Sequence, residues 1–505
     1  MVVNLLGFDP MREDMRSAQI VVHGHFYQPP RENPWTGQID PQPDAGPFRD
    51  WNERVYAECY RPNAFVQIGS PEGERVVNNY ELMSFNIGPT LLGWIKGTHP
   101  DTYRRIIQAD ETSRIDRGYG NAMAQAYHHT ILPLSPPRDV RTQITWGLAD
   151  FAAHFGRRAD GMWLPETAAS DHVLAALIDA GVGFTILAPW QAANWREDGG
   201  EWMDARSNPV DVRYPYVYRH PDGSDRTITL FFYDAEIARA IAFERGISSA
   251  ENFAGLFAER IASNGTLVHA ATDGETYGHH HKFGELGLAY GLHVEAPERG
   301  LKPTNYAAYL ARNPARREVR ISEGEGTSWS CSHGVGRWKR NCGCSTGGRP
   351  GWNQKWRAPL RAALEIVRDS ADSSFGRAGR MLLRDPWEAR DRYVHVLLGE
   401  ITAEDFVQSE ATRSLQAAEV ERAKKLLELQ NMSMSMFTSC GWFFNDLAGV
   451  ETVQIMKYAA RTLEMLIELD EYAPVDAFLG TLASARSNDP AEGSGLDIFT
   501  RIKNE

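Results

Sequence analysis

Two carboxylates in this chain stand directly after short apolar runs, where α/β proteins keep their chemistry. Asp273 follows the apolar segment 266–272 and opens the sequence Asp-Gly-Glu-Thr-Tyr-Gly-His-His-His, which ends at His281. Glu166 ends a second apolar run, which begins at Gly161. Catalytic side chains of α/β folds gather at the carboxyl ends of parallel strands. Two acids in such positions indicate paired-carboxylate catalysis, with a sugar as the most natural substrate.

Histidine and aromatic side chains close to these acids could position a sugar. His23 and His25 end an apolar run that starts at Ala18, and Trp163 stands three residues before Glu166. Aromatic rings can pack against sugar faces and imidazoles can hydrogen-bond hydroxyl groups, although core packing is the plainer role of each. Further substrate-binding or supporting side chains are expected from Glu275, His279 and His280, beside Asp273, and from Trp329 on a later loop.

Three cysteines and a histidine are concentrated between residues 331 and 344. Cys331, His333, Cys342 and Cys344 offer three thiolates and an imidazole, a ligand set of tetrahedral structural zinc. The spacing lacks the C-x₂-C pair of zinc knuckles, so unliganded loop cysteines and a redox pair stay open as alternatives. Five cysteines in 505 residues fit a reducing compartment better than a disulfide framework.

The elements that would position these residues alternate between apolar runs and helical patterns from about residue 18 to residue 321. Such alternation predicts parallel βαβ units. Polar residues follow several of the apolar runs, which favours a barrel-like sheet with one functional rim. The strands are expected at 18–22, 162–166, 184–187, 227–233 and 266–272.

Past residue 351 the strand signals vanish and apolar residues recur at spacings of three and four. We therefore predict a catalytic α/β domain over 1–350 and an all-helical domain over 351–505 that packs on its rim. A chain of 505 residues has room for two domains. The helices of the second domain are expected at 356–367, 386–398, 403–431 and 450–469.

Composition excludes several classes of partner. A formal net charge of −13, with no long basic block, argues against nucleic acid and anionic membranes. No stretch approaches the roughly 20 apolar residues of a spanning helix. The N-terminus lacks the apolar core of a signal peptide, so we expect a cytoplasmic protein. Neither a phosphate-cradling glycine loop nor a dinucleotide fingerprint occurs, and no organic cofactor is expected.

Four segments, in one order, resemble glycoside hydrolase family 57, which acts on α-glucans. They are 23–30 (His-Gly-His-Phe-Tyr-Gln-Pro-Pro), 80–92, Trp163-Leu-Pro-Glu166 and 273–280. By this resemblance Glu166 matches the family's nucleophile and Asp273 its general acid/base. The chain departs from the family pattern where Phe26 and Tyr27 precede Gln28, which leaves the role of Gln28 open.

The resemblance implies an incomplete (β/α)₇ barrel with helical additions. It also implies a retaining enzyme of the amylase, 4-α-glucanotransferase or branching type, with an α-glucan or maltooligosaccharide as substrate and no cofactor required for catalysis. Residues 437–446 are similar to the family's fifth segment, in which the helical region closes over the substrate, so Trp442 is expected at the substrate. An interdomain core patch is the alternative for this segment.

Two other functions are compatible with the same residues. His23, His25, Asp273 and His280 could hold a zinc ion that activates water, as in a metal-dependent carbohydrate hydrolase or deacetylase. A glucan-binding protein without catalysis is the second alternative, although intact acids at both positions argue against it. A retaining glycosidase needs its two carboxyl groups about 5–5.5 Å apart. The placement of Glu166 and Asp273 therefore distinguishes this interpretation from the two alternatives.

Overall fold

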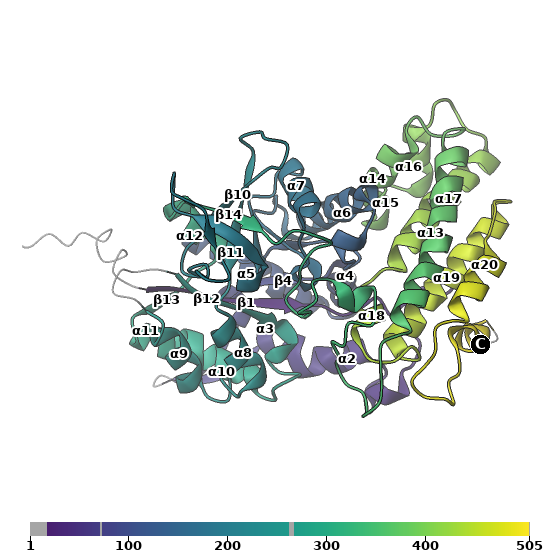
Figure 1. The fold of residues 1–505 in the computed structure, drawn as a ribbon. Coiled ribbons are helices and arrows are strands. Elements are labelled where there is room, and N and C mark those ends of the chain that lie inside the picture. The colour runs from purple at the N-terminus through teal and green to yellow at the C-terminus, as the bar shows by residue number, and fades with distance from the viewer. Residues whose placement is uncertain (1–17, 71–72, 262–266, 504–505) are drawn as a thin grey trace, which may run out of the picture.

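A computed structural model describes residues 18–70, 73–261 and 267–503 of the chain. It is a mixed α/β structure followed by a large helical region (Figure 1). The predicted strand at 266–272 corresponds to β12, Leu267–Asp273, and its first residue lies outside the described part. Every helix among the described residues is too short or too polar to cross a membrane.

Strand β1, Ala18–Phe26, is the centre of the first sheet. It runs parallel to β12 on one side and to β4, Ser84–Ile87, on the other. Its start also pairs with β13, Leu301–Pro303. All nine residues of β1 are buried, as expected for a parallel strand covered on both faces. The register sets His25 opposite both Asp273 and Asn86, so these side chains share one end of the sheet.

Further short strands continue from β4 around the same end of the molecule. A bridge joins Phe85 to Ala122, just before β5, Ala124–Gln125, which pairs in parallel with β6, Met162–Trp163. A second bridge joins Gly161 to Phe184 at the start of β7, Phe184–Leu187, which runs parallel to β11, Thr227–Phe232. The backbone N–H of Asp234, after β11, donates to the carbonyl of His269 in β12 at 2.9 Å.

The second sheet also contains antiparallel strands that the βαβ pattern does not predict. Its order is β7-β11-β10-β14-β8-β9. The added strands are β10 (Tyr216–Arg219), β14 (Arg317–Ile321), β8 (Ala192–Arg196) and β9 (Met203–Asp204). A separate hairpin pairs β2, Val66–Ser70, with β3, Gly73–Val77.

Helices cover the strands on opposite sides (Figure 1). Apolar residues of the two sheets and of these helices form one core over residues 18–321. Gly156, at φ +63°, ends α6 in the left-handed conformation that glycine adopts without strain. The helices are α2 (Trp51–Val55), α3 (Arg61–Ala64), α4 (Pro89–Thr98), α5 (Pro100–Arg117), α6 (Pro137–Phe155), α7 (Asp171–Asp179), α8 (Ala235–Phe243), α9 (Ala250–Ala258), α10 (Gly284–Tyr290), α11 (Ala296–Glu298) and α12 (Tyr306–Arg312).

The C-terminal region is helical, and α13, α17 and α19 pack together as its frame (Figure 1). The single helix expected at 403–431 is wrong, because α16 ends at Glu410 and α17 begins at Ala417. Tertiary contacts interrupt it: the Glu410 carbonyl accepts from the Arg384 N–H, and Arg392 pairs with the Glu410 carboxylate. The helices are α13 (Arg357–Gly379), α14 (Pro386–Arg392), α15 (Val394–Leu397), α16 (Ala403–Glu410), α17 (Ala417–Ser435), α18 (Cys440–Phe443), α19 (Val450–Glu468), α20 (Val475–Leu482) and α21 (Gly495–Ile502).

The helical region packs directly on the α/β part. Trp146 of α6 lies in a core cluster with residues of α13, α16 and α17. Arg390 of α14, fully buried, pairs with Asp139 of α6 at 2.8 Å. A second cluster joins Ile131, Ala168 and Trp338 to the helices α13, α19 and α20. The loops at the carboxyl ends of the strands are therefore held between the two regions.

Candidate active site

The two predicted catalytic acids lie at the carboxyl ends of β12 and β6. Asp273 is the last residue of β12, and Glu166 lies three residues after β6 in a short turn, Pro165–Thr167. Burial and the charges of Glu275 and Glu166 raise the pKa of Asp273 well above its usual value. Glu166 can act on that pKa only if its carboxylate lies close by. Residues 107 positions apart in the sequence thus lie near enough for the charge of one to act on the other.

Glu166 is held in a strained backbone conformation by a later loop. Its φ is +57°, in the left-handed region that non-glycine residues rarely adopt. The backbone N–H of Trp329 donates to the Glu166 carbonyl at 3.1 Å. The Trp329 indole N–H and the Ser330 hydroxyl both donate to one carboxylate oxygen, Oε2, at 2.9 and 2.7 Å. Within the described chain the other oxygen, Oε1, has no hydrogen-bond partner, so it is free to meet a ligand.

The charge environment of Glu166 balances opposing effects. Burial raises its pKa, whereas the hydrogen bonds from Ser330 and Trp329 and the positive charge of Arg337 lower it, with a net rise. The Asp273 carboxyl and the Cys440 thiol also lie within reach of its charge. A carboxylate with two donors on one oxygen and a nearby guanidinium is suited to stay ionised near neutral pH.

Unlike the Glu166 carboxylate, the Asp273 carboxyl group has no hydrogen-bond partner within the described chain. Protein atoms surround its carboxyl closely enough to raise the pKa, yet part of its side chain stays open to solvent. Glu275, beside it, is buried and accepts from the Tyr60 hydroxyl at 2.6 Å and the Tyr27 backbone N–H at 3.0 Å. Burial raises the pKa of Glu275 to about 7. With two carboxyls beside it, Asp273 retains its proton more readily than an isolated aspartate, as a general acid must.

His23 and His25 are buried and joined in a hydrogen-bonded chain. The Asn86 Oδ1 accepts from His23 Nε2 at 3.0 Å, and Asn86 Nδ2 donates to His25 Nδ1 at 2.9 Å. The proton of neutral His25 is then on Nε2, which donates to Nε2 of His129 at 3.0 Å. His129 in turn donates from Nδ1 to the Ser439 hydroxyl at 2.7 Å. The chain thus runs from β1 to the start of α18.

Burial lowers the pKa of both His23 and His25 to about 3, so both rings are neutral at physiological pH. Trp163 stacks on them, with ring centroids 4.8 and 5.1 Å away. Its other contact is edge-on with Trp329 at 5.2 Å. Trp163 is fully buried in this arrangement, so it supports Trp329 and the histidines from beneath.

Three other predicted residues form no hydrogen bond with either acid in the described chain. His279 hydrogen-bonds Glu58 through Nδ1 at 2.5 Å, and His280 is exposed beside it. Trp442 is buried in the helical region, where its N–H donates to the Arg357 carbonyl and its ring stacks with Phe437. The structure therefore brings Glu166, Asp273, Glu275, His23, His25, Trp163 and Trp329 to one end of the sheet.

Sequence reasoning missed Ser330, Asn86, His129 and Ser439. Asn86 lies inside the quoted segment 80–92, and His129 is one of two adjacent histidines, so local signals existed for both. Ser330 and Ser439 have no such signal. Their partners, Glu166 and His129, are 164 and 310 residues away in the chain.

The predicted cysteine and histidine ligands do come together. One ligand atom from each of Cys331, His333, Cys342 and Cys344 lies within 4.8 Å of all the others. Cys331 Sγ is 3.9 Å from Cys342 Sγ, and Cys344 Sγ is 3.5 Å from His333 Nδ1. This group could hold a metal ion. No group of His23, His25, Asp273 and His280 meets the same condition in the described chain.

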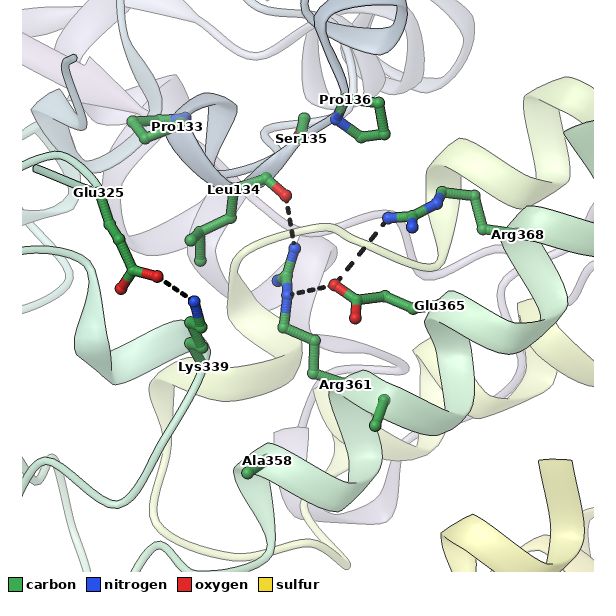
Figure 2. Close-up of a pocket in the computed structure, with 11 residues that line it drawn as sticks. Pro133, Leu134, Ser135, Pro136, Glu325, Lys339, Ala358, Arg361, Glu365 and Arg368 are labelled. Atoms are coloured by element: carbon green, nitrogen blue, oxygen red, sulfur yellow. Dashed lines mark hydrogen bonds and ion pairs between the residues drawn. The ribbon is translucent and has the colours of Figure 1, made fainter. Parts of the chain in front are cut away.

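A hollow of about 510 Å³ lies away from both acids, between the loop 133–136, the loop around Lys339 and helix α13 (Figure 2). Arg361 projects into it and donates to the Leu134 carbonyl at 2.9 Å. Glu365 pairs with Arg361 and lies 3.9 Å from Arg368, and Glu325 pairs with Lys339, so two carboxylates face three cations (Figure 2).

Comparison with known proteins gives two family matches. The family model described as Glycosyl hydrolase family 57 matches residues 41–320. A second model, a domain of unknown function named DUF3536, matches residues 352–504. The 4-alpha-glucanotransferase of Thermococcus litoralis is 28% identical over 191 residues, which are 38% of this chain and 25% of that protein. The chain thus matches a quarter of the length of that curated relative.

Solved structures share the fold over nearly the whole chain. The exo-type maltose-forming amylase of Pyrococcus sp. ST04 superposes with a TM-score of 0.69 at 15% identity, covering 92% of this chain and 82% of that one. The GH57-type branching enzyme of Pyrococcus horikoshii has a TM-score of 0.56 at 14% identity, covering 97% and 94%. At such low identity these likenesses concern the fold.

Proposed function

The chain belongs to glycoside hydrolase family 57, and we propose that it is a retaining enzyme of α-glucans or maltooligosaccharides. Its reaction would be of the amylase, 4-α-glucanotransferase or branching type. The names of its relatives, a glucanotransferase, an amylase and a branching enzyme, support this range of activities. Two observations carry the proposal. Two hydrogen-bond donors orient the Glu166 carboxylate. The charge of Glu166 helps to raise the pKa of Asp273, which has no hydrogen-bond partner of its own in the described chain.

The proposed mechanism is a double displacement. Oε1 of Glu166 attacks the anomeric carbon while Asp273 gives its proton to the departing glycosidic oxygen, so a glycosyl ester forms as the glycosidic bond breaks. Asp273, now ionised, takes a proton from water or from a sugar hydroxyl, and that oxygen displaces Glu166. Water gives hydrolysis and a sugar hydroxyl gives transfer; either route retains the anomeric configuration.

We also propose that the α/β part is an incomplete (β/α)₇ barrel within a domain of residues 1–350, with 351–505 as the helical domain. The neighbour order β12-β1-β4-β5-β6-β7-β11, with a hydrogen bond from Asp234 back to β12, supports a nearly closed ring. The family matches over 41–320 and 352–504 support a boundary near residue 350.

Two further assignments accompany the proposed activity. The Cys331 group would hold a structural Zn²⁺, because three thiolates and an imidazole are ligands that zinc prefers. Catalysis itself would need no cofactor. None of the five cysteines forms a disulfide bond, which supports a reducing, cytoplasmic location. The net charge of −13 supports a neutral sugar over nucleic acid or a membrane as partner.

The test is a product assay on amylose, maltooligosaccharides and glycogen. Proton NMR of the first products shows whether the new reducing end, or the new linkage, keeps the α configuration. We expect α products, and their chain lengths and linkages would separate amylase, transferase and branching types. A first-formed β anomer, or no turnover on any of the three substrates, would overturn the proposal.

A further inference from the structure

We infer that a Zn²⁺ ion on Cys331, His333, Cys342 and Cys344 fixes the loop that orients Glu166. The inference rests on the proposed function for the role of Glu166. It assigns the metal a positioning task outside the chemistry: the ion holds the residues that in turn hold the nucleophile.

The observed distances fit a tetrahedral zinc site. Zinc bonds of about 2.3 Å to sulfur and about 2.0 Å to nitrogen place two sulfurs about 3.8 Å apart, and a sulfur and a nitrogen about 3.5 Å apart. The corresponding separations here are 3.9 Å for Cys331 and Cys342, and 3.5 Å for Cys344 and His333. A disulfide between Cys331 and Cys342 would not account for the approach of Cys344 and His333 to the same point.

The metal group is continuous with the support of Glu166. Cys331 directly follows Ser330, which donates to Glu166 Oε2. The same loop pairs with the other side of the Glu166 turn, because Thr327 and Ala169 exchange both backbone hydrogen bonds. Any shift of Cys331 along the chain would therefore move the Ser330 hydroxyl relative to the nucleophile.

The surrounding segment has little secondary structure to hold it. Between the turn Gly336–Trp338 and the start of α13 at Arg357, the described chain forms neither helix nor strand. Most of residues 339–351 are exposed, so apolar burial does not order this stretch. A metal cross-link from Cys342 and Cys344 back to Cys331 would order this segment, because it ties the far end of the loop to the residue beside Ser330.

Buried positive charge beside the group suits a metal site with a net negative charge. Arg357 is fully buried and Arg337 nearly so, and neither forms an ion pair with a carboxylate in the described chain. Arg357 donates to the Cys344 carbonyl at 3.2 Å, and Arg337 donates to the Thr346 hydroxyl at 3.0 Å. Zinc with three thiolates and a neutral imidazole carries a net charge of about −1. That charge would offset the cost of burying the two guanidinium groups.

The first experiment measures metal in the full-length protein, purified under reducing conditions without an affinity metal. We expect one zinc per chain by mass spectrometry and less than a tenth of that in Cys344→Ser. Ser345→Ala, an exposed neighbour, is the matched control and should keep its zinc. As a check that does not depend on variant folding, Co²⁺ exchanged into the wild type should show thiolate charge-transfer absorption. A wild type that takes up neither ion would overturn the inference.

The second experiment tests the link to Glu166. Cys344→Ser, with wild-type circular dichroism, should lose about 10-fold in kcat/KM. The acidic limb of its pH profile should move to higher pH, because Glu166 loses donors that favour its ionised form. An unchanged rate and pH profile in a zinc-free variant would refute the positioning role. A wild type that binds zinc but turns over no glucan would refute the proposed function and leave the metal site standing.

Discussion

Ser330 and Glu166, 164 residues apart, are joined by a 2.7 Å hydrogen bond to Oε2. Because the Trp329 indole donates to the same oxygen, the carboxylate is held on one side, which leaves Oε1 open for the proposed attack on the substrate. The proposed nucleophile is therefore oriented by a loop that follows the last strand of the α/β part, and not by its own neighbours in the chain. Residues on this loop should affect the rate of reaction without touching the sugar.

Removing either proposed catalytic acid should abolish most of the activity. Glu166→Gln and Asp273→Asn should each lower kcat on maltooligosaccharides by about 10³-fold or more, since one removes the nucleophile and the other the proton donor. Azide should partly restore turnover of an activated substrate by Glu166→Ala, giving a glycosyl azide of inverted configuration.

The control for these variants is Glu236→Gln, an exposed carboxylate at the start of α8. It should leave kcat within about twofold of wild type, as expected for a surface charge. Near-full activity in both acid variants would show that the acid pair has been wrongly assigned.

Ser330→Ala should reveal how the donor tunes Glu166. One of two hydrogen bonds to the ionised carboxylate is lost, so the pKa of Glu166 rises further above its usual value. The nucleophile must be ionised, and the acidic limb of kcat/KM should therefore move to higher pH, with a fall of about 10-fold at neutral pH. Ser373→Ala, exposed on α13, serves as the control, and identical profiles for the two variants would contradict this role.

Glu275→Gln should shift the basic limb of the pH profile of kcat/KM. The Glu275 charge is second only to burial among the causes that raise the pKa of Asp273, so its removal lowers that pKa. A general acid works only while protonated, and the basic limb of kcat/KM should therefore move to lower pH. The amide oxygen of Gln can still accept from Tyr60 and from the Tyr27 backbone, which keeps the fold intact.

The effect should be confined to pH values at which Glu275 is charged. Because burial raises its own pKa to about 7, wild type and variant should differ most above pH 7 and converge below it. Asp50→Asn would change a carboxylate that caps α2 and is not among the causes that raise the pKa of Asp273, so it is expected to leave the basic limb in place. A basic limb that stays fixed in Glu275→Gln would mean that this charge does not reach the general acid.

Local sequence predicts the strands that carry the acids, because β1, β6, β7, β11 and β12 are buried and appear as apolar runs ending in polar residues. The antiparallel strands β8 and β9 leave no such signal, since they are only partly buried. Helical periodicity also continues across the break between α16 and α17, where the Arg392–Glu410 pair overrides it.

The site could be predicted only where one segment contains several functional side chains. Glu166 and Trp163, or Asp273 and Glu275, share a segment and are visible in the sequence. The Glu166–Ser330 and His129–Ser439 contacts are not, because chain folding alone brings their partners together over more than 160 residues. A serine carries no periodicity or spacing that distinguishes such a role.

Ser439→Ala should test whether the helical region completes the histidine chain. His129 is buried, and its Nδ1 donates to the Ser439 hydroxyl, so the variant leaves a buried N–H without an acceptor. The cost should be about 1–3 kcal/mol of unfolding free energy, measurable as a lower melting temperature by calorimetry. Ser373→Ala removes a hydroxyl that bonds within α13 on the surface, and its melting temperature should match wild type. Equal melting temperatures for all three proteins would mean that water replaces the hydroxyl. Because His129 also holds His25, a loss of rate without a matching loss of stability would indicate that the histidine chain also positions the end of β1 that we propose binds the sugar.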